Sequence, residues 1–200
     1  RELLVAEGAA HATDNGATGH LMRDNGMPHD SMANTVRLFL GTRLECAQCH
    51  NHPFDHWTQK QFFEMAAFFG SMRYRDNRVL GNYRDLRKEL ANEEQRTRQA
   101  ALQLVRRLTQ GIQGNGSGIE KLPKDYQYDD ARPLAPIKAS TIFGSKVKLA
   151  YPKNSRSQSK RAQRQRRQRN AMVAGINSRE ALADWMTDKK NPQFTKVIAN

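Results

Sequence analysis

Residues 34–70, NTVRLFLGTRLECAQCHNHPFDHWTQKQFFEMAAFFG, hold a motif rich in cysteine and histidine between two apolar stretches. The first stretch predicts an amphipathic helix over 34–45, with Asn34 or Thr35 as its cap. The apolar stripe of this helix consists of Val36, Phe39, Leu40 and Leu44. Because the motif follows directly, we expect its thiols to lie at the end of a buried helix.

The stretch after the motif predicts a second helix. Thr58 and Gln61 have the spacing of a capping box, in which the two side chains satisfy free backbone N–H groups at a helix start. Gly70 ends the predicted helix. Its core face consists of Phe62, Met65, Ala66 and Phe69, widened by Phe63 and Phe68. The two helices together predict a mainly α-helical module around the motif.

The motif itself, Cys46-Ala47-Gln48-Cys49-His50, contains both cysteines of the chain. Its pattern is that of a c-type haem attachment site. Two thiols at this spacing can add to the two vinyl groups of one haem, and the adjacent histidine can then serve as an axial ligand. We predict that Cys46 and Cys49 bind haem c covalently and that His50 is the proximal ligand of the iron.

Other interpretations of the motif remain open. Cys46, Cys49, His52 and His56 have the ligand types of a structural Zn²⁺ site, although their spacing is shorter than in a zinc finger. The two cysteines could also form a disulfide or remain as thiols. A thioredoxin-like redox pair is disfavoured, because it requires a βαβ setting and the flanks here are predicted helical. With zinc or a disulfide, the chain would be a non-redox structural or binding module.

The neighbouring polar residues suggest further roles at a haem site. His52 and His56 are predicted to contact a haem propionate or to support His50 through outer hydrogen bonds. Asp55 could do the same or act as an ordinary surface carboxylate. The distal ligand stays open, and each candidate also fits an ordinary loop residue. The candidates are His11, His20, His29, Met22, Met27 and Met32.

The composition indicates a modest core. Only 38% of the 200 residues are hydrophobic, and the mean hydropathy is −0.83. No stretch approaches the roughly 20 apolar residues of a transmembrane helix. The chain does not begin with Met and has no signal peptide, so we expect a piece of a larger protein or a mature product. No Ser-His-Asp signature is present, which disfavours a hydrolase. Whether the chain is an enzyme stays open, and the haem motif favours an electron carrier over a catalyst.

The net charge of +13 is concentrated in one segment. Residues 153–170 contain eight Lys or Arg residues and no acid. Such a run could bind nucleic acid or an acidic partner. It has no interleaved aromatic residues for stacking on bases, so we favour a solvated connector and expect no nucleic-acid binding.

The remaining segments predict a long irregular connector and at most one short β hairpin. Residues 1–33 are expected to be loop after a short helix end, 83–110 a polar helix and 111–118 a flexible linker. Strand candidates are 141–143 and 146–151, and helices are expected from Ser178 and after Pro192.

Several of these stretches resemble a known family. Residues 38–44, 46–55, 57–58 and 66–69 closely resemble the second planctomycete-specific cytochrome C-like domain. Residues 178–185, 191–192 and 197–200 resemble the opening of the planctomycete-specific domain that commonly follows it, and 122–130 the segment between the two.

The resemblance implies three parts of a large exported protein. Residues 1–80 would be the cytochrome C-like module, 81–177 a connector and 178–200 the start of a second helical domain. The expected location is periplasmic or otherwise extracytoplasmic. The expected partners are a redox protein or neighbouring domains of the same polypeptide.

Overall fold

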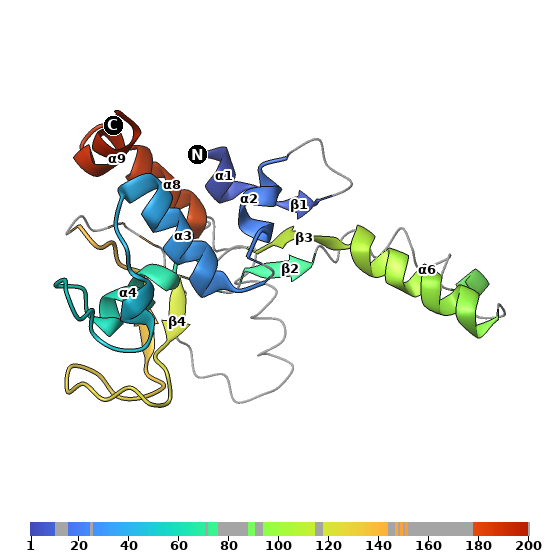
Figure 1. The fold of residues 1–200 in the computed structure, drawn as a ribbon, viewed down its shortest axis with the longest axis horizontal. Helices are drawn as coiled ribbons and strands as arrows, with labels where there is room; N and C mark the ends of the chain where they lie inside the picture. The colour runs from blue at the N-terminus through green and yellow to red at the C-terminus, as the bar shows by residue number, and fades with distance from the viewer. Residues whose placement is uncertain are drawn as a thin grey trace. The chain divides into compact units, whose positions relative to one another are not determined.

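The computed structural model of the chain describes residues 1–10, 16–24, 26–70, 72–75, 88–90, 94–114, 118–143, 147, 149, 151 and 178–199 (Figure 1). The helices are α1 (Glu2–Val5), α2 (Thr18–Met22), α3 (Pro28–Leu40), the 3-10 helix η1 (Glu45–Gln48), α4 (Gln59–Ala66), α6 (Gln95–Leu108), α8 (Ser178–Thr187) and α9 (Pro192–Ala199). The strands are β1 (Gly8–Ala9), β2 (Arg73–Arg75), β3 (Gln110–Gln113), β4 (Ile119–Lys121) and β5 (Pro136–Lys138).

The mainly α class is confirmed, with short strands added. These strands form two small antiparallel sheets, of order β1-β3-β2 and β4-β5, rather than the single hairpin expected at most. The chain forms two compact units. We call Arg1, Met27–Ser71 and Asn115–Asn200 the motif unit, and Glu2–Gly26 and Met72–Gly114 the sheet unit.

Helix α3 of the motif unit starts earlier than its sequence predicts. It begins at Pro28, where the missing N–H costs no helical hydrogen bond, and not at Asn34 or Thr35. Polar residues around Ser31 concealed the first turns, yet Ser31 itself is buried. Gly41 ends the helix with a left-handed φ of 62°, which glycine adopts without steric cost. The predicted helix over 34–45 therefore stops before the motif.

The core of the motif unit is aromatic. Phe62 and Phe63 of α4 contact each other edge to face, with ring centroids 5.4 Å apart. His29 of α3 packs edge-on against both rings, at 5.8 and 5.2 Å. Fully buried neighbours include Met32, Val36, Leu40, Leu44, Met65, Phe68 and Phe69. These are largely the apolar stripes that the sequence predicts on either side of the motif.

Burial of His29 makes the stability of the fold depend on pH. Desolvation lowers the pKa of its imidazole below 6.5, against smaller opposing effects of Glu120 and Asp30. The unfolded chain therefore binds more protons just below pH 6.5, and stability falls as the pH drops through that window. The slope for one such group is at most about 1.4 kcal/mol per pH unit.

We expect His29→Leu to flatten the pH dependence of unfolding between about pH 7 and 5, measured by urea denaturation at each pH. His20 of the sheet unit, whose pKa burial also lowers, keeps part of the slope. The difference between variant and wild type isolates His29. Parallel stability curves for the two proteins would contradict the prediction.

The start of α4 has the capping box that the sequence predicts. The Thr58 hydroxyl accepts a hydrogen bond from the Gln61 backbone at 3.2 Å, and the Gln61 side chain accepts one from Thr58 N–H at 2.9 Å. Two backbone donors that the helix leaves unpaired are thus satisfied. The chain leaves α4 in turns that reach Gly70.

We expect Thr58→Ala to lower the free energy of unfolding by about 1 kcal/mol, because the cap acceptor is lost. Thr58→Ser keeps the hydroxyl and should stay close to wild type. Thermal unfolding followed by circular dichroism compares the three proteins. Equal losses in both variants would show that the hydroxyl does not stabilise the helix start.

The hairpin β4-β5 lies against α4. It pairs Ile119 with Lys138 and Lys121 with Pro136. Sequence reasoning missed this hairpin because its strands are three residues long and lie 14 residues apart. The strand predicted at 141–143 is wrong, since these residues form a turn. Of the candidate at 146–151, only residues 147, 149 and 151 lie within the described part of the chain.

Helices α8 and α9 occur where the sequence predicts them and pack against other elements of the motif unit. The buried Ser178 hydroxyl donates to the Phe68 carbonyl at 2.7 Å. Helix α9 lies against α3, where Phe39 and Phe194 approach to 6.3 Å between ring centroids. The domain boundaries at 80 and 177 stay a prediction.

In the sheet unit, β3 pairs with both β1 and β2. Gly8 faces Ile112 and Ala9 faces Gly111. Gly111 is required by this close approach, because a Cβ there would lie 2.3 Å from the Gly8 carbonyl oxygen. The predicted linker 111–118 is therefore partly strand. Of the polar helix predicted over 83–110, α6 confirms residues 95–108, whereas Glu94 lies outside the helix and Gln110 belongs to β3. Residues 83–87 and 91–93 lie outside the described residues.

Candidate functional site

The Cys-x-x-Cys motif lies on η1, a single turn of 3-10 helix. Such a helix has three residues per turn, so positions three apart share a side. Leu44 and Ala47 are fully buried, whereas Cys46 and Cys49 are exposed. The Cys49 N–H closes the turn on the Cys46 carbonyl at 3.4 Å. The buried pair anchors η1 to the core, and both thiols lie on its solvent side.

The exposed thiols differ from the buried helix end expected from the sequence. The difference arises because Gly41 turns the chain out of α3 before the motif begins. Cys46 and Cys49 are free thiols and are not joined to each other, so the disulfide alternative is not present in the structure.

The His50 ring is exposed, and one hydrogen bond orients it. Its Nδ1 atom lies 2.7 Å from the Asn51 carbonyl oxygen. A carbonyl oxygen can only accept, so Nδ1 must carry the hydrogen. In the neutral ring, Nε2 then keeps its lone pair and can bind a metal ion.

His52 has the opposite arrangement. The Phe54 N–H donates to Nδ1 of His52 at 3.2 Å, which places the ring hydrogen of neutral His52 on Nε2. The backbone N–H of His52 also donates to the Trp57 carbonyl at 2.8 Å, closing the loop. His52 therefore holds the loop together and has no nitrogen lone pair left for a ligand.

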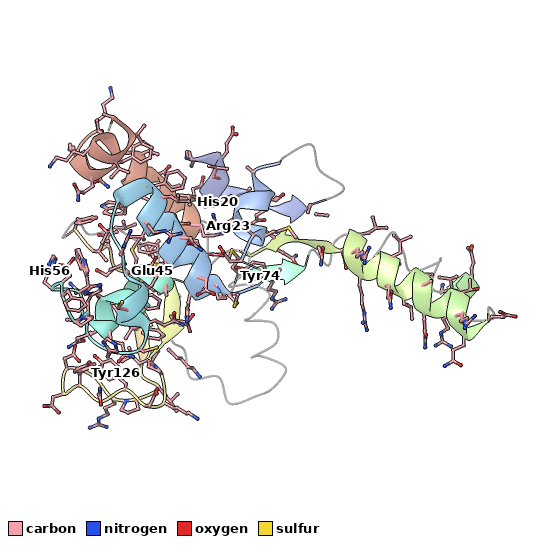
Figure 2. All side chains as sticks on the ribbon, in the orientation of Figure 1. His20, Arg23, Glu45, His56, Tyr74 and Tyr126 are labelled. Atoms are coloured by element: carbon pink, nitrogen blue, oxygen red, sulfur yellow. The ribbon has the colours of Figure 1, made fainter. Side chains whose placement is uncertain are left out.

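Asp55 and His56 form an exposed pair on the same loop, and Figure 2 labels His56. Nδ1 of His56 lies 2.6 Å from Oδ1 of Asp55, and the His56 backbone N–H donates to the same oxygen at 2.8 Å. The backbone hydrogen bond is the main cause that lowers the pKa of the Asp55 carboxyl. The His56 ring packs on Trp57, with centroids 4.0 Å apart. The Trp57 side chain is buried, and its indole N–H has no hydrogen-bond partner among the described residues.

The zinc alternative requires four groups that the structure does not bring together. In the described parts of the chain, no three His, Cys, Asp or Glu side chains are grouped so that they could hold a metal ion. All four proposed ligands, Cys46, Cys49, His52 and His56, belong to those parts. For His52, the local reason is that its Nδ1 lone pair accepts a hydrogen bond from the Phe54 N–H and is not available to a metal ion.

Asn51 links the motif to the rest of the motif unit through three polar groups. Its carbonyl accepts from His50, and its side-chain oxygen accepts from the Gln59 N–H at 2.9 Å. Its own N–H donates to the Tyr128 hydroxyl oxygen at 2.7 Å. The buried Gln59 side chain returns to the motif, donating to the Gln48 carbonyl at 3.0 Å.

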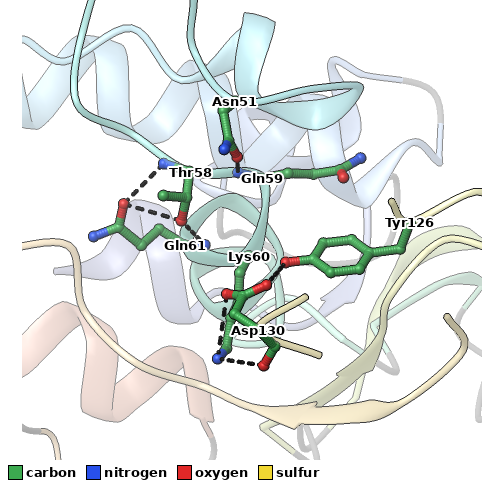
Figure 3. Close-up of polar contacts among 7 residues, drawn as sticks. All are labelled: Asn51, Thr58, Gln59, Lys60, Gln61, Tyr126 and Asp130. Atoms are coloured by element: carbon green, nitrogen blue, oxygen red, sulfur yellow. Dashed lines mark hydrogen bonds and ion pairs between the residues drawn. The ribbon is translucent and has the colours of Figure 1, made fainter. Parts of the chain in front are cut away.

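Tyr128 belongs to the loop between β4 and β5, residues 122–135, which we call the tyrosine segment. Asp130 accepts a hydrogen bond from the Tyr126 hydroxyl and pairs with Lys60 of α4 at 3.5 Å (Figure 3). Burial, followed by this hydrogen bond, raises the pKa of Tyr126. The rings of Tyr126 and Tyr128 meet edge to face, with centroids 5.4 Å apart. The segment is thus held against α4 next to the motif.

Sequence reasoning noted the tyrosine segment only as a connector and missed its part in the site. Its contact with Asn51 joins residues 77 apart, which no local pattern reveals. Asn51 and Gln59 lay inside the motif region, but their role depends on backbone partners that a sequence does not show.

The candidate distal ligands are spread over the chain. His20 and Met22 belong to the sheet unit, whereas His29, Met27 and Met32 belong to the motif unit. The ring contacts of His29 and the complete burial of Met32 make both part of the core. Met27 is half exposed, and His11 lies outside the described residues. The distal ligand therefore stays open.

Two further sequence predictions concern a membrane-spanning helix and the basic run. Among the described residues, no helix is long and apolar enough to cross a membrane. The basic run at 153–170 lies outside the described residues, so its predicted role as a solvated connector stays a prediction.

Comparison with known families agrees with the resemblance seen in the sequence. Residues 5–74 match the model of PSCyt2, described as a protein of unknown function (DUF1549). The match contains the whole motif, α3 and α4. No curated protein and no solved structure shows a significant similarity to the chain. Over residues 5–74, about a third of its length, this chain is therefore similar to the PSCyt2 family.

Proposed function

We propose that this chain contributes a haem c-binding electron-transfer module to a larger exported protein. The observation that carries the proposal is the hydrogen bond from Nδ1 of His50 to the Asn51 carbonyl. It leaves Nε2 of His50 with a lone pair in the residue that follows two free, exposed thiols.

The two thiols fit covalent attachment. Each S–H would add across one vinyl C=C bond, so that sulfur bonds to one carbon and hydrogen to the other, with no oxidant or reductant consumed. Cys46 and Cys49 lie on the same side of η1, three residues apart, so both sulfurs are open to one planar group. Their exposure leaves access for that group during attachment.

His50 fits the proximal position. The hydrogen bond to the Asn51 carbonyl orients the ring and fixes its tautomer. It also raises the basicity of Nε2, because the polarised Nδ1–H bond leaves more electron density on the ring. An iron held there would supply one-electron transfer at a potential set by its two axial ligands. The chain would contribute the ligand, its orientation and the polarity around it.

The exposed position of the site supports exchange of electrons with a partner at the protein surface. Phe54, four residues after His50, is 94% exposed and offers an apolar contact beside the site. The partner would be a redox protein or a neighbouring domain of the same polypeptide. Covalent haem attachment implies assembly outside the cytoplasm, so the proposed location is periplasmic or otherwise extracytoplasmic.

The test is a pyridine haemochrome spectrum of the full chain, produced together with a haem c maturation system and purified under denaturing conditions. We expect a haem α-band and the mass of one haem that both survive denaturation. Folded protein without a covalent α-band, confirmed by circular dichroism, would refute the proposal. Metal analysis of the same sample would detect zinc, which a chelator removes.

A further inference from the structure

We propose that Tyr128 is a positioning residue for His50, and that the tyrosine segment thereby sets the strength of the axial ligand. The inference deepens the proposed function and rests on it for the role of His50. The contacts themselves are properties of the chain alone.

A hydrogen bond, rather than packing, holds the His50 ring. The ring is exposed, so packing against neighbours does not fix it. Its orientation depends on the single hydrogen bond to the Asn51 carbonyl. Whatever fixes the backbone of Asn51 therefore fixes the ring and its tautomer.

Asn51 is held by hydrogen bonds to two different segments. Its side chain is held from one side by the Gln59 N–H at the start of α4. From the other side, the Tyr128 hydroxyl accepts the Asn51 N–H at 2.7 Å. In the described part of the chain, this hydrogen bond ties the Asn51 backbone to another segment of the motif unit. The conformation of Asn51, and with it the direction of its carbonyl, thus depends on Tyr128.

Tyr128 is held by contacts of the tyrosine segment. Its ring lies against Tyr126, whose hydroxyl is bonded to Asp130, and Asp130 pairs with Lys60 (Figure 3). The ends of the segment are joined by the hydrogen bond from Leu122 N–H to the Ala135 carbonyl at 3.1 Å. The loop that carries Tyr128 is therefore held in place by two hydrogen bonds and one ion pair.

Tyr128→Phe tests the inference, because it removes only the hydroxyl. Tyr74→Phe is a matched control, since it removes a hydroxyl from a tyrosine in β2 of the sheet unit, which belongs neither to the tyrosine segment nor to the contacts that hold it. The first measurement uses the full chain without haem, labelled with ¹⁵N-histidine, at a pH where imidazole is neutral. His50→Gln identifies the His50 signals.

In Tyr128→Phe we expect the ratio of Nδ1–H to Nε2–H tautomer of His50 to fall by roughly threefold, the effect of a net hydrogen bond at the weak end of the range. Tyr74→Phe should keep the wild-type ratio. An unchanged ratio in Tyr128→Phe, or an equal fall in both variants, would overturn the inference.

The second measurement uses the haem-loaded chain. With a weaker hydrogen bond on Nδ1, the imidazole donates less charge, so the midpoint potential of Tyr128→Phe should rise above that of wild type and of Tyr74→Phe. An equal potential in all three proteins would overturn the link to ligand strength. A chain without covalent haem would refute the proposed function, whereas the tautomer result would still decide the role of Tyr128.

Discussion

Phe62→Ala is expected to lower the free energy of unfolding by about 3 to 5 kcal/mol, because it opens a cavity in the aromatic core of the motif unit. The Phe62 ring is fully buried and packs against Phe63 and His29. Total stabilities of domains are about 5 to 15 kcal/mol, so this loss would leave the protein close to unfolding. Urea unfolding at pH 7, followed by Trp fluorescence and circular dichroism, measures the change.

Phe54→Ala is the matched control for this variant. It removes the same ring from a position that is 94% exposed, so its effect should stay within about 0.5 kcal/mol. Comparable losses at Phe54 and Phe62 would mean that the core does not lie where the structure places it. A difference of several kcal/mol separates burial from ring chemistry, because the deleted atoms are identical.

The double variant Cys46→Ser/Cys49→Ser is expected to lose all covalently bound haem. Serine hydroxyls do not add to vinyl groups under these conditions, and no other thiol exists in the chain. Each single variant should keep one thioether, and its pyridine haemochrome band should lie at a longer wavelength, because one vinyl group then stays conjugated with the ring. Absorption and intact mass after denaturation measure both outcomes.

The free energy of unfolding of the cysteine variants shows whether a loss of haem comes from lost attachment or from lost folding. Both thiols are exposed, so exchange for serine should change the free energy of unfolding by no more than about 0.5 kcal/mol. Loss of haem would then reflect loss of attachment and not of folding. If haem survives denaturation in the double variant, another group holds it, and the assignment of the motif fails.

The elements that the sequence predicts well are those fixed by local patterns. The capping box at Thr58, the apolar face from Phe62 to Phe69 and the two C-terminal helices each follow from residues within one or two helical turns. The start of α3 was missed because its first turns bury small and polar side chains such as Ser31.

The parts of the site that depend on distant residues were not predictable. The motif identified Cys46, Cys49 and His50, but exposure of the thiols depends on how Gly41 redirects the chain. The tautomers of His50 and His52 depend on the folded loop, where one ring meets a carbonyl and the other an N–H group. The contribution of Tyr128 depends on a hairpin whose strands are too short to leave a pattern.

The order β1-β3-β2 has a practical consequence for fragments of this protein. The segment that matches the PSCyt2 family ends at residue 74, within β2, whereas β3, which separates β1 from β2, spans Gln110–Gln113. A polypeptide cut to the family match would keep β1 and most of β2 without the strand between them. Their unpaired edges would then be free to recruit other chains, so such a fragment should aggregate where the longer chain stays dispersed.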